Sequence, residues 1–334
     1  MAKIYLNKME FPFTFISEVI NKYTHNTHSN KYPSQKETIS AKKKLLRLLS
    51  LTTLTHNNLI LGNGSDELIS LLIATTHHHY QIGFFKPTFT MYKKYCKSYN
   101  KKFIEINLNN FKLNTTTLHQ IKYCKLFFIC NPNNPNGNSF SKQQLIQLIT
   151  AYPQTYFIVD EAYTYYSKIS LVNYISTHPN LIILQTLSKI GFAGSRVGIM
   201  LSNTNLITHY NKHKSPYNLG NNQLEILNKV ATSNLYKLIQ IGINRIQHTK
   251  QLVTQKIQLI KTINLLKSKS NFILITKKTG QLLPYKNIEV KPLILNTQSY
   301  QRISIGKTQE MLVFLKMLFR NEKRILFRKK NLRK

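Results

Sequence analysis

Residues 181–196 read Leu-Ile-Ile-Leu-Gln-Thr-Leu-Ser-Lys-Ile-Gly-Phe-Ala-Gly-Ser-Arg. The apolar run at the start is short and lacks helical periodicity, so it predicts a buried strand. Lys189 then lies just past the strand end, between hydroxyl residues and Arg196. Lysine can form a Schiff base with a carbonyl cofactor, and hydroxyls with a guanidinium suit a phosphate. An ordinary surface lysine is the competing interpretation, because the chain contains 47 lysines and arginines.

The composition describes a globular chain. Its 334 residues suffice for one large and one small domain, and 42% hydrophobic residues suffice for a packed core. No apolar run approaches the roughly 20 residues of a membrane helix, and the N-terminus lacks the order of a secretory signal. The three cysteines have no paired spacing. These features predict a cytoplasmic protein with reduced thiols.

The charge is strongly basic, since 47 Lys and Arg against 12 Asp and Glu give a formal net charge of +35. This raises the hypothesis of a protein that binds nucleic acid or another polyanion. The lysines are spread along the whole chain, however, and Asn, Ile, Lys and Tyr are abundant together, which indicates drift from AT-rich coding. We therefore do not expect a nucleic-acid partner. A positive field would still attract small anionic substrates.

Short apolar segments alternate with helix-length segments over the first two thirds of the chain. The predicted strands are 58–61, 81–85, 102–106, 125–130, 156–160, the run from 181, and 196–201. Amphipathic or capped segments predict helices that include 40–51, 67–75 and 142–151. This alternation predicts an α/β fold with a largely parallel sheet. Ligands of such sheets bind outside the carboxyl ends of the strands, where the chain places Asp66, Asn134, Asp160, Tyr163 and Lys189.

The two ends of the chain do not follow this alternation of strands and helices. Pro33 disfavours helix at Tyr32, and we expect the aromatic N-terminal segment to be extended. Residues 221–268 predict long helices, and the strands and helix predicted after them indicate a smaller α+β unit: 271–275, 288–290, 301–305 and 309–318. The expected divisions are an arm at 1–33, a large domain at 34–220, an interdomain helix with the small domain at 221–319, and a solvated or frayed basic tail at 320–334.

Three segments at predicted strand ends have the chemistry of a ligand site. Gly62–Asp66 precedes a helix, and its glycines permit either a phosphate cradle of backbone N–H groups or a plain capped turn. Asn131–Gly137 contains two prolines and four asparagines, so it predicts a fixed loop. Asp160 ends a buried strand, where an unpaired carboxylate is costly and a paired role is favoured. We expect no metal at His77–His79, because adjacent histidines rarely converge on one ion.

Taken in chain order, the motifs of this sequence resemble those of fold-type I pyridoxal-phosphate aminotransferases, most closely the histidinol-phosphate aminotransferase group. The likeness runs from about Asn7 to about Leu318. The matching segments are Lys31–Pro33, Gly62–Glu67, Lys86–Tyr92, Asn131–Gly137, Val159–Tyr163, Thr186–Lys189, Arg196–Gly198 and Arg302–Gly306. The resemblance implies a large α/β domain with a mainly parallel seven-stranded sheet between helices, a smaller α+β domain, and pyridoxal 5′-phosphate as cofactor. The spacing of seven between Lys189 and Arg196 is one shorter than in many relatives.

The resemblance also implies roles for the residues of these motifs. Lys189 would hold the cofactor as a Schiff base and then act as the general base. Asp160 would pair with the ring nitrogen, while Asn134 and Tyr163 would bind the phenolic oxygen. Phe89 would stack on the ring. The phosphate would be held by Gly64, Ser65, Asp66, Thr186, Ser188 and Arg196, with Tyr32 supplied by the partner subunit of a homodimer that shares its active sites.

For the substrate, the resemblance implies that Arg302 binds the α-carboxylate of glutamate and helps to hold a substrate phosphate. Asn7 and Phe11 match a segment that contacts substrate, but relatives usually have tyrosine at the position of Phe11, so one hydrogen bond would be lost. The segment 276–301 is short, which leaves its substrate contacts open. The implied reaction converts L-histidinol phosphate and 2-oxoglutarate into imidazole-acetol phosphate and glutamate, in histidine biosynthesis.

Three alternatives remain open. A threonine-phosphate decarboxylase shares the lysine, aspartate and asparagine signatures, but we rank it lower because the arm lacks its usual His-Gly-Gly segment. An aromatic amino-acid aminotransferase has the same fold. A polyanion-binding protein would belong to a different class, and it would show salt-dependent nucleic-acid binding without the absorbance of a lysine-bound cofactor.

Overall fold

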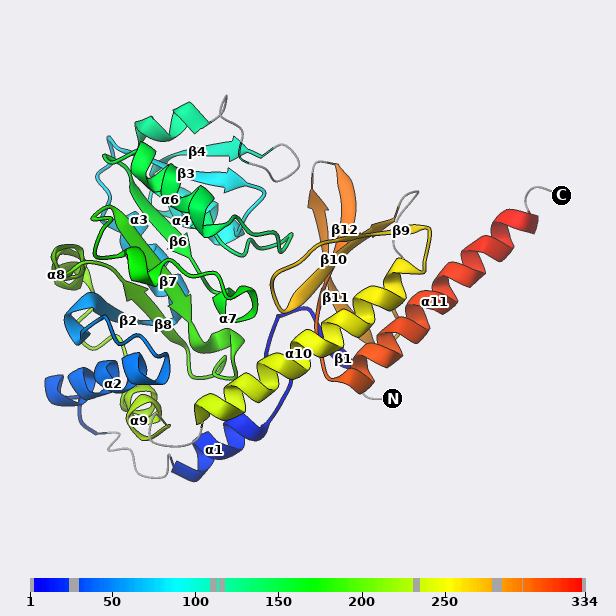
Figure 1. Cartoon of the computed structure of the whole chain (residues 1–334), viewed down its shortest axis with the longest axis horizontal. Coiled ribbons are helices and arrows are strands. Elements are labelled where there is room, and N and C mark those ends of the chain that lie inside the picture. The colour runs from blue at the N-terminus through cyan, green and yellow to red at the C-terminus, as the bar shows by residue number, and fades with distance from the viewer. Residues whose placement is uncertain are drawn as a thin grey trace.

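The computed structural model describes residues 3–23, 30–108, 113, 118–230, 235–277, 284–295 and 297–331. Figure 1 shows two sheets on opposite sides of the view, joined by the long helix α10 (Leu235–Gln258). In the described part of the chain, the large sheet has seven strands and the small sheet has five.

The large sheet is mainly parallel, as predicted. Its order is β2-β8-β7-β6-β5-β3-β4. The strands are β2 (Leu59–Asn63), β3 (Gln81–Lys86), β4 (Lys102–Asn107), β5 (Cys124–Cys130), β6 (Tyr156–Asp160), β7 (Leu181–Thr186) and β8 (Val197–Leu201). Strands β3 to β7 pair in parallel, and β8 runs antiparallel to both β2 and β7. The parallel register therefore brings the carboxyl ends of β5, β6 and β7 to one edge.

Both faces of the large sheet are buried, which explains why its strands are continuous apolar runs. In β7, Ile182 and Leu184 belong to the apolar cluster formed with α3 (Gly64–Ala74) and α4 (Thr90–Ser98). The alternate residues Leu181 and Ile183 belong to the larger cluster on the other face. That face is covered by helices that include α2 (Gln35–Leu48) and α6 (Lys142–Ala151).

The small sheet has the order β1-β11-β12-β10-β9. Its strands are β1 (Ile4–Leu6), β9 (Ile263–Leu266), β10 (Phe272–Lys277), β11 (Ile288–Leu295) and β12 (Gln298–Ser304). Helices α10 and α11 (Thr308–Asn331) pack against each other beside it. Strand β1 pairs with β11, so the start of the N-terminal segment is part of this sheet.

The structure corrects two sequence expectations and adds one helix. The extended arm is wrong over α1 (Phe15–Tyr23), because Ile16 and Ile20 bury one helical face against α9 (Asn221–Val230) and α10. Strand β9 interrupts the helices predicted through 268, since it pairs with β10. Helix α8 (Thr204–His213) was not predicted.

The basic C-terminal tail, predicted to be solvated or frayed, is helical over its described residues. Helix α11 continues through the basic residues to Asn331, because lysine and arginine favour helix. Residues 332–334 lie outside the described residues, as do 278–283 and 296 of the short segment before Arg302. Among the described residues, none of the helices combines the length and the apolar character that crossing a bilayer requires.

Candidate active site

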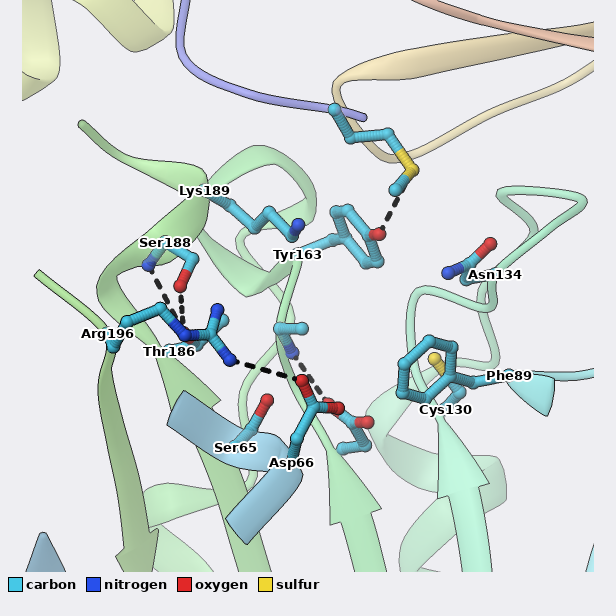
Figure 2. A pocket seen from close by; sticks show the side chains of 13 residues that line it. Ser65, Asp66, Phe89, Cys130, Asn134, Tyr163, Thr186, Ser188, Lys189 and Arg196 are labelled. Carbon is cyan, nitrogen blue, oxygen red and sulfur yellow. Dashed lines mark hydrogen bonds and ion pairs between the residues drawn. The ribbon is translucent and has the colours of Figure 1, made fainter. Parts of the chain in front are cut away.

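One cavity lies at the carboxyl ends of β5, β6 and β7, and it collects most of the predicted site residues (Figure 2). Its lining residues are Met9, Ser65, Asp66, Phe89, Cys130, Asn134, Asp160, Ala162, Tyr163, Thr186, Ser188, Lys189 and Arg196. They come from the N-terminal segment, the start of α3, the loop before α4 and the ends of adjacent strands. The alignment of parallel strand ends therefore brings these side chains together in one cavity.

Lys189 is directed into this cavity by a turn at the end of β7. The Ser188 N–H donates to the Thr186 hydroxyl and starts the 3₁₀ turn Leu187–Lys189. The Lys189 carbonyl accepts a 2.6 Å hydrogen bond from the Tyr166 hydroxyl, which fixes the backbone. Burial lowers the pKa of Lys189, and the positive charge of Arg302 lowers it further. A lowered pKa increases the fraction of neutral amine, the form that acts as nucleophile or base.

Asp160 ends β6 as a deeply buried carboxylate, with 3% of its surface exposed. It accepts hydrogen bonds from the Tyr92 hydroxyl at 2.7 Å and from the Ala162 N–H at 3.1 Å. Burial raises the pKa of Asp160 to about 6, against the opposing effect of these hydrogen bonds. No lysine or arginine of the described chain forms an ion pair with it. The site therefore presents a carboxylate that a cationic group would stabilise.

Two glycines let β8 approach the first turn of α3. Gly64 has φ 75°, and a Cβ there would lie 2.6 Å from Arg196 Nη2. A Cβ at Gly198 would lie 2.2 Å from the carbonyl carbon of Gly64. The Gly64 N–H donates to the Arg196 carbonyl at 2.6 Å and closes this contact. The Gly64 N–H is thereby occupied, but the side chain of Asn63 forms no cap, so the N–H groups of Ser65 and Asp66 keep the capacity to bind an anion.

Hydroxyls and a guanidinium surround this helix start. Figure 2 shows Ser65, Thr186, Ser188 and Arg196 on the same side of the cavity. The Thr186 hydroxyl donates to Ser188 Oγ at 2.9 Å, and Arg196 Nη2 lies 3.3 Å from an Asp66 carboxylate oxygen. That ion pair is half-exposed, so it holds Arg196 only weakly. We call Gly64, Ser65, Asp66, Thr186, Ser188 and Arg196 the anion cradle, because their donors suit a phosphate.

Arg302 reaches the cavity loop from the small sheet. This buried guanidinium donates to Asn134 Oδ1 at 2.5 Å and to the Asn7 carbonyl at 3.2 Å. Its Nε is buried without a hydrogen-bond partner. The Asn7 side chain donates to Glu289 at 2.6 Å. Arg302 thus joins the N-terminal segment and the small sheet to the loop that carries Asn134.

Five predicted site residues do not line the cavity: Gly64, Asn7, Arg302, Phe11 and Tyr32. The last two lie elsewhere. Phe11 packs with Phe13 and Phe15, and it fills the space beside Gly242 of α10, where a Cβ would meet the Phe11 ring. Tyr32 is 76% exposed and stacks on Tyr217, with ring centroids 4.3 Å apart. Neither side chain lines the cavity.

The family described as aminotransferase class I and II matches residues 4–318. The chain belongs to this aminotransferase family. It is 33% identical to the histidinol-phosphate aminotransferase of Buchnera aphidicola subsp. Cinara cedri, over 92% of this chain and 89% of the relative.

Solved structures show the same fold. The histidinol-phosphate aminotransferase from Sinorhizobium meliloti, in complex with pyridoxal-5′-phosphate, has a TM-score of 0.81 at 17% identity, covering 97% of this chain and 92% of its own. The L-threonine-O-3-phosphate decarboxylase from Porphyromonas gingivalis has a TM-score of 0.80 at 16% identity, and the match covers 96% of this chain and 99% of the decarboxylase chain. The fold assignment to the aminotransferase family is therefore confirmed, and the protein is an enzyme of that family.

Sequence reasoning missed several residues in and around this aminotransferase cavity. Tyr92 of α4 is fully buried outside the cavity lining and acts on the site through its hydrogen bond to Asp160; its position three residues after Phe89 is the signal that could have identified it. Met9 and Ala162 carry no chemistry that the sequence would single out. Cys130 pairs with Asp160 in the sheet register, and burial raises the pKa of its thiol well above the ordinary value, so it is not a nucleophile. The described residues contain no group of three or more side chains suited to a metal.

Proposed function

We propose that this aminotransferase uses pyridoxal 5′-phosphate to transfer the amino group of L-histidinol phosphate to 2-oxoglutarate, in histidine biosynthesis. The observation that supports this best is the single cavity that brings Lys189, Asp160 and the anion cradle together. The relatives named histidinol-phosphate aminotransferase support the choice of substrate.

The donor set fits the proposed cofactor. A phosphate would occupy the anion cradle, where hydroxyls, a guanidinium and a helix start converge. The ring nitrogen would lie against Asp160, whose buried carboxylate forms no ion pair with a lysine or arginine of the described residues. Phe89 would contact the ring face, and Asn134 and Tyr163 would bind the ring oxygen. When bound, the cofactor supplies the electron sink that stabilises a carbanion at the amino carbon of the substrate.

The residues of the chain then have distinct tasks. Lys189 holds the cofactor and moves the proton at the substrate carbon, a task that its lowered pKa favours. Asp160 keeps negative charge at the ring nitrogen. Burial raises the pKa of Tyr163 well above its ordinary value, so its hydroxyl stays protonated as a donor. Arg302 binds the anionic end of the substrate, with the fork geometry that suits carboxylate and phosphate.

We further propose a homodimer in which Tyr32 reaches the anion cradle of the other subunit. Its exposure and its stacking on Tyr217 support this, because the two rings present an aromatic surface outside the chain's own cavity. A buried ring of this size would contribute substantially to an interface.

A parallel assay of two phosphorylated substrates tests the proposed reaction. We expect glutamate to form when L-histidinol phosphate and 2-oxoglutarate are supplied. We expect no carbon dioxide from O-phospho-L-threonine, although the decarboxylase neighbour shares the fold. Decarboxylation without amino transfer would contradict the proposal.

Replacing Arg196 with glutamine tests the anion cradle. We expect the Kd of the cofactor to rise by about 10- to 100-fold, because hydrogen bonds to charged groups contribute about 1.5–3 kcal/mol. Titration followed by the absorbance of the bound cofactor measures this. Arg47→Gln is the matched control, since it removes the same charge from an exposed position of α2. Equal weakening in both variants would indicate only a general charge effect.

A further inference from the structure

Met9 lines the cavity, although no role has been assigned to it. It is 8% exposed and packs with Ala162, Tyr163 and Phe272. Its backbone has φ 56°, in the left-handed region that side chains other than Asn, Asp and Gly rarely adopt. Such a conformation costs on the order of 1–3 kcal/mol and persists only where the surroundings impose it.

Hydrogen bonds from the small sheet impose this conformation. The Met9 N–H donates to the hydroxyl of Ser304, the last residue of β12, at 2.7 Å. The Met9 carbonyl accepts from the side-chain amide of Asn271, which precedes β10, at 3.0 Å. The Met9 backbone is therefore fixed from both sides, and its side chain is directed into the cavity wall.

The Met9 thioether contacts the surroundings of the reactive lysine. Its sulfur accepts a hydrogen bond from the Tyr163 hydroxyl at 3.3 Å (Figure 2, dashed line from Tyr163). Lys189 Nζ lies 5.9 Å from the centroid of the same Tyr163 ring. A thioether is only a weak acceptor, so this contact leaves the hydroxyl free to take a stronger acceptor.

The same N-terminal segment also contacts the anion-binding guanidinium, because Arg302 donates to the Asn7 carbonyl. The segment is thus joined to Lys189 through Met9 and Tyr163, and to Arg302 through Asn7. A substrate whose amine reaches Lys189 and whose anionic group reaches Arg302 must pass along it. Met9 is the apolar side chain of the segment that this substrate would meet in the cavity wall.

We propose that Met9 is a specificity-determining residue that selects amino substrates carrying a flat, unsaturated ring. This deepens the proposed transaminase function and rests on it. Sulfur of methionine forms favourable contacts with aromatic rings. The Tyr163 ring lines the cavity beside Met9, and the fully buried Phe272 packs against both.

The test compares L-histidinol phosphate with L-alaninol phosphate, which share the amine and the phosphate and differ in the imidazole ring. In the holoenzyme of Met9→Ala, we expect the ratio of their kcat/KM values to fall at least about tenfold, because filling such a wall contributes about 1–3 kcal/mol of discrimination. Met9→Leu keeps the side-chain volume but lacks the sulfur, so the ratio should fall by less than it does in Met9→Ala.

A second readout does not depend on turnover. Without 2-oxoglutarate, L-histidinol phosphate should raise the thermal unfolding midpoint of the wild type more than L-alaninol phosphate does, and Met9→Ala should lose this difference. If Met9→Ala does not fold, Met9→Gln carries the test, because it keeps the length and replaces the apolar end.

An unchanged ratio, or an equal loss for both substrates, would overturn the proposal, since equal loss indicates a residue that only positions Tyr163. Failure of the proposed function is a separate result, in which the wild type uses neither phosphorylated substrate. Selection for a ring is then measured as the ratio of the kcat/KM value for L-phenylalanine to that for L-alanine. A fall of that ratio in Met9→Ala supports the role of Met9, and an unchanged ratio overturns it.

Discussion

Lys189→Ala is expected to lower kcat for transamination by at least about a thousandfold. A positioned general base alone contributes about 10²–10⁴-fold, and the same residue would also hold the cofactor covalently. The measurements are kcat at saturating cofactor and the visible absorbance of the lysine-bound cofactor, which should disappear.

The matched control for this prediction is Lys122→Ala. Lys122 is an exposed lysine of the 3₁₀ turn before β5, and it is not part of the cavity. Its replacement removes one positive charge without touching the site. Retention of both activity and absorbance in Lys189→Ala would mean that another residue performs the reaction.

Asp160→Asn is expected to lower kcat by about 100- to 1000-fold. Asparagine fills the same space at the end of β6 but carries no charge to stabilise a protonated ring nitrogen, and loss of one preorganised electrostatic contact costs about this much. Steady-state kinetics at saturating cofactor measure the effect. A loss that appears only in KM would contradict an electrostatic role in the reaction itself.

The same substitution should also change how the free energy of unfolding of the cofactor-free protein depends on pH. Burial raises the pKa of Asp160 from 3.8 to about 6, so the folded protein binds a proton that the unfolded chain releases. Its contribution to stability is full below pH 3.8 and is lost as the pH rises through about 6. Within this window, the free energy of unfolding of the wild type should fall relative to Asp160→Asn by about 1.4 kcal/mol per pH unit.

Titration of the neighbouring Glu161 does not affect the difference between the two proteins. Burial raises its pKa to about 7 in the same direction, but it is present in both proteins and cancels in the difference. Denaturant unfolding at several pH values measures both curves. Parallel curves would contradict the assignment of the raised pKa to Asp160.

The predicted site residues at the strand ends lie together in the structure for a simple physical reason. Lys189, Asp160 and Asn134 each follow a buried strand, and parallel pairing of β5, β6 and β7 requires their ends to meet. The strands could be predicted from continuous apolar runs because both faces of the large sheet are covered. Strands of such a sheet do not alternate apolar and polar residues.

Residues brought in from distant segments could not be predicted in this way. Met9 reaches the cavity because Ser304 and Asn271 hold its backbone in a left-handed conformation. Phe11 instead fills the space that Gly242 leaves on α10. The placement of Met9 depends on the small sheet and that of Phe11 on α10, and no local sequence pattern near residues 9 or 11 indicates either contact.

Helix α1 and strand β9 were missed for a related reason. Each is short, and tertiary partners stabilise it: α9 and α10 cover α1, and β10 pairs with β9. Local propensity is a weak signal for such elements.

The central claim is that Lys189 holds the cofactor in this cavity, and covalent mapping tests it most directly. The protein loaded with pyridoxal 5′-phosphate is reduced with borohydride, digested, and analysed by mass spectrometry. We predict that the cofactor mass is found on the peptide that contains Lys189. Labelling of other lysines with Lys189 unmodified would contradict the account.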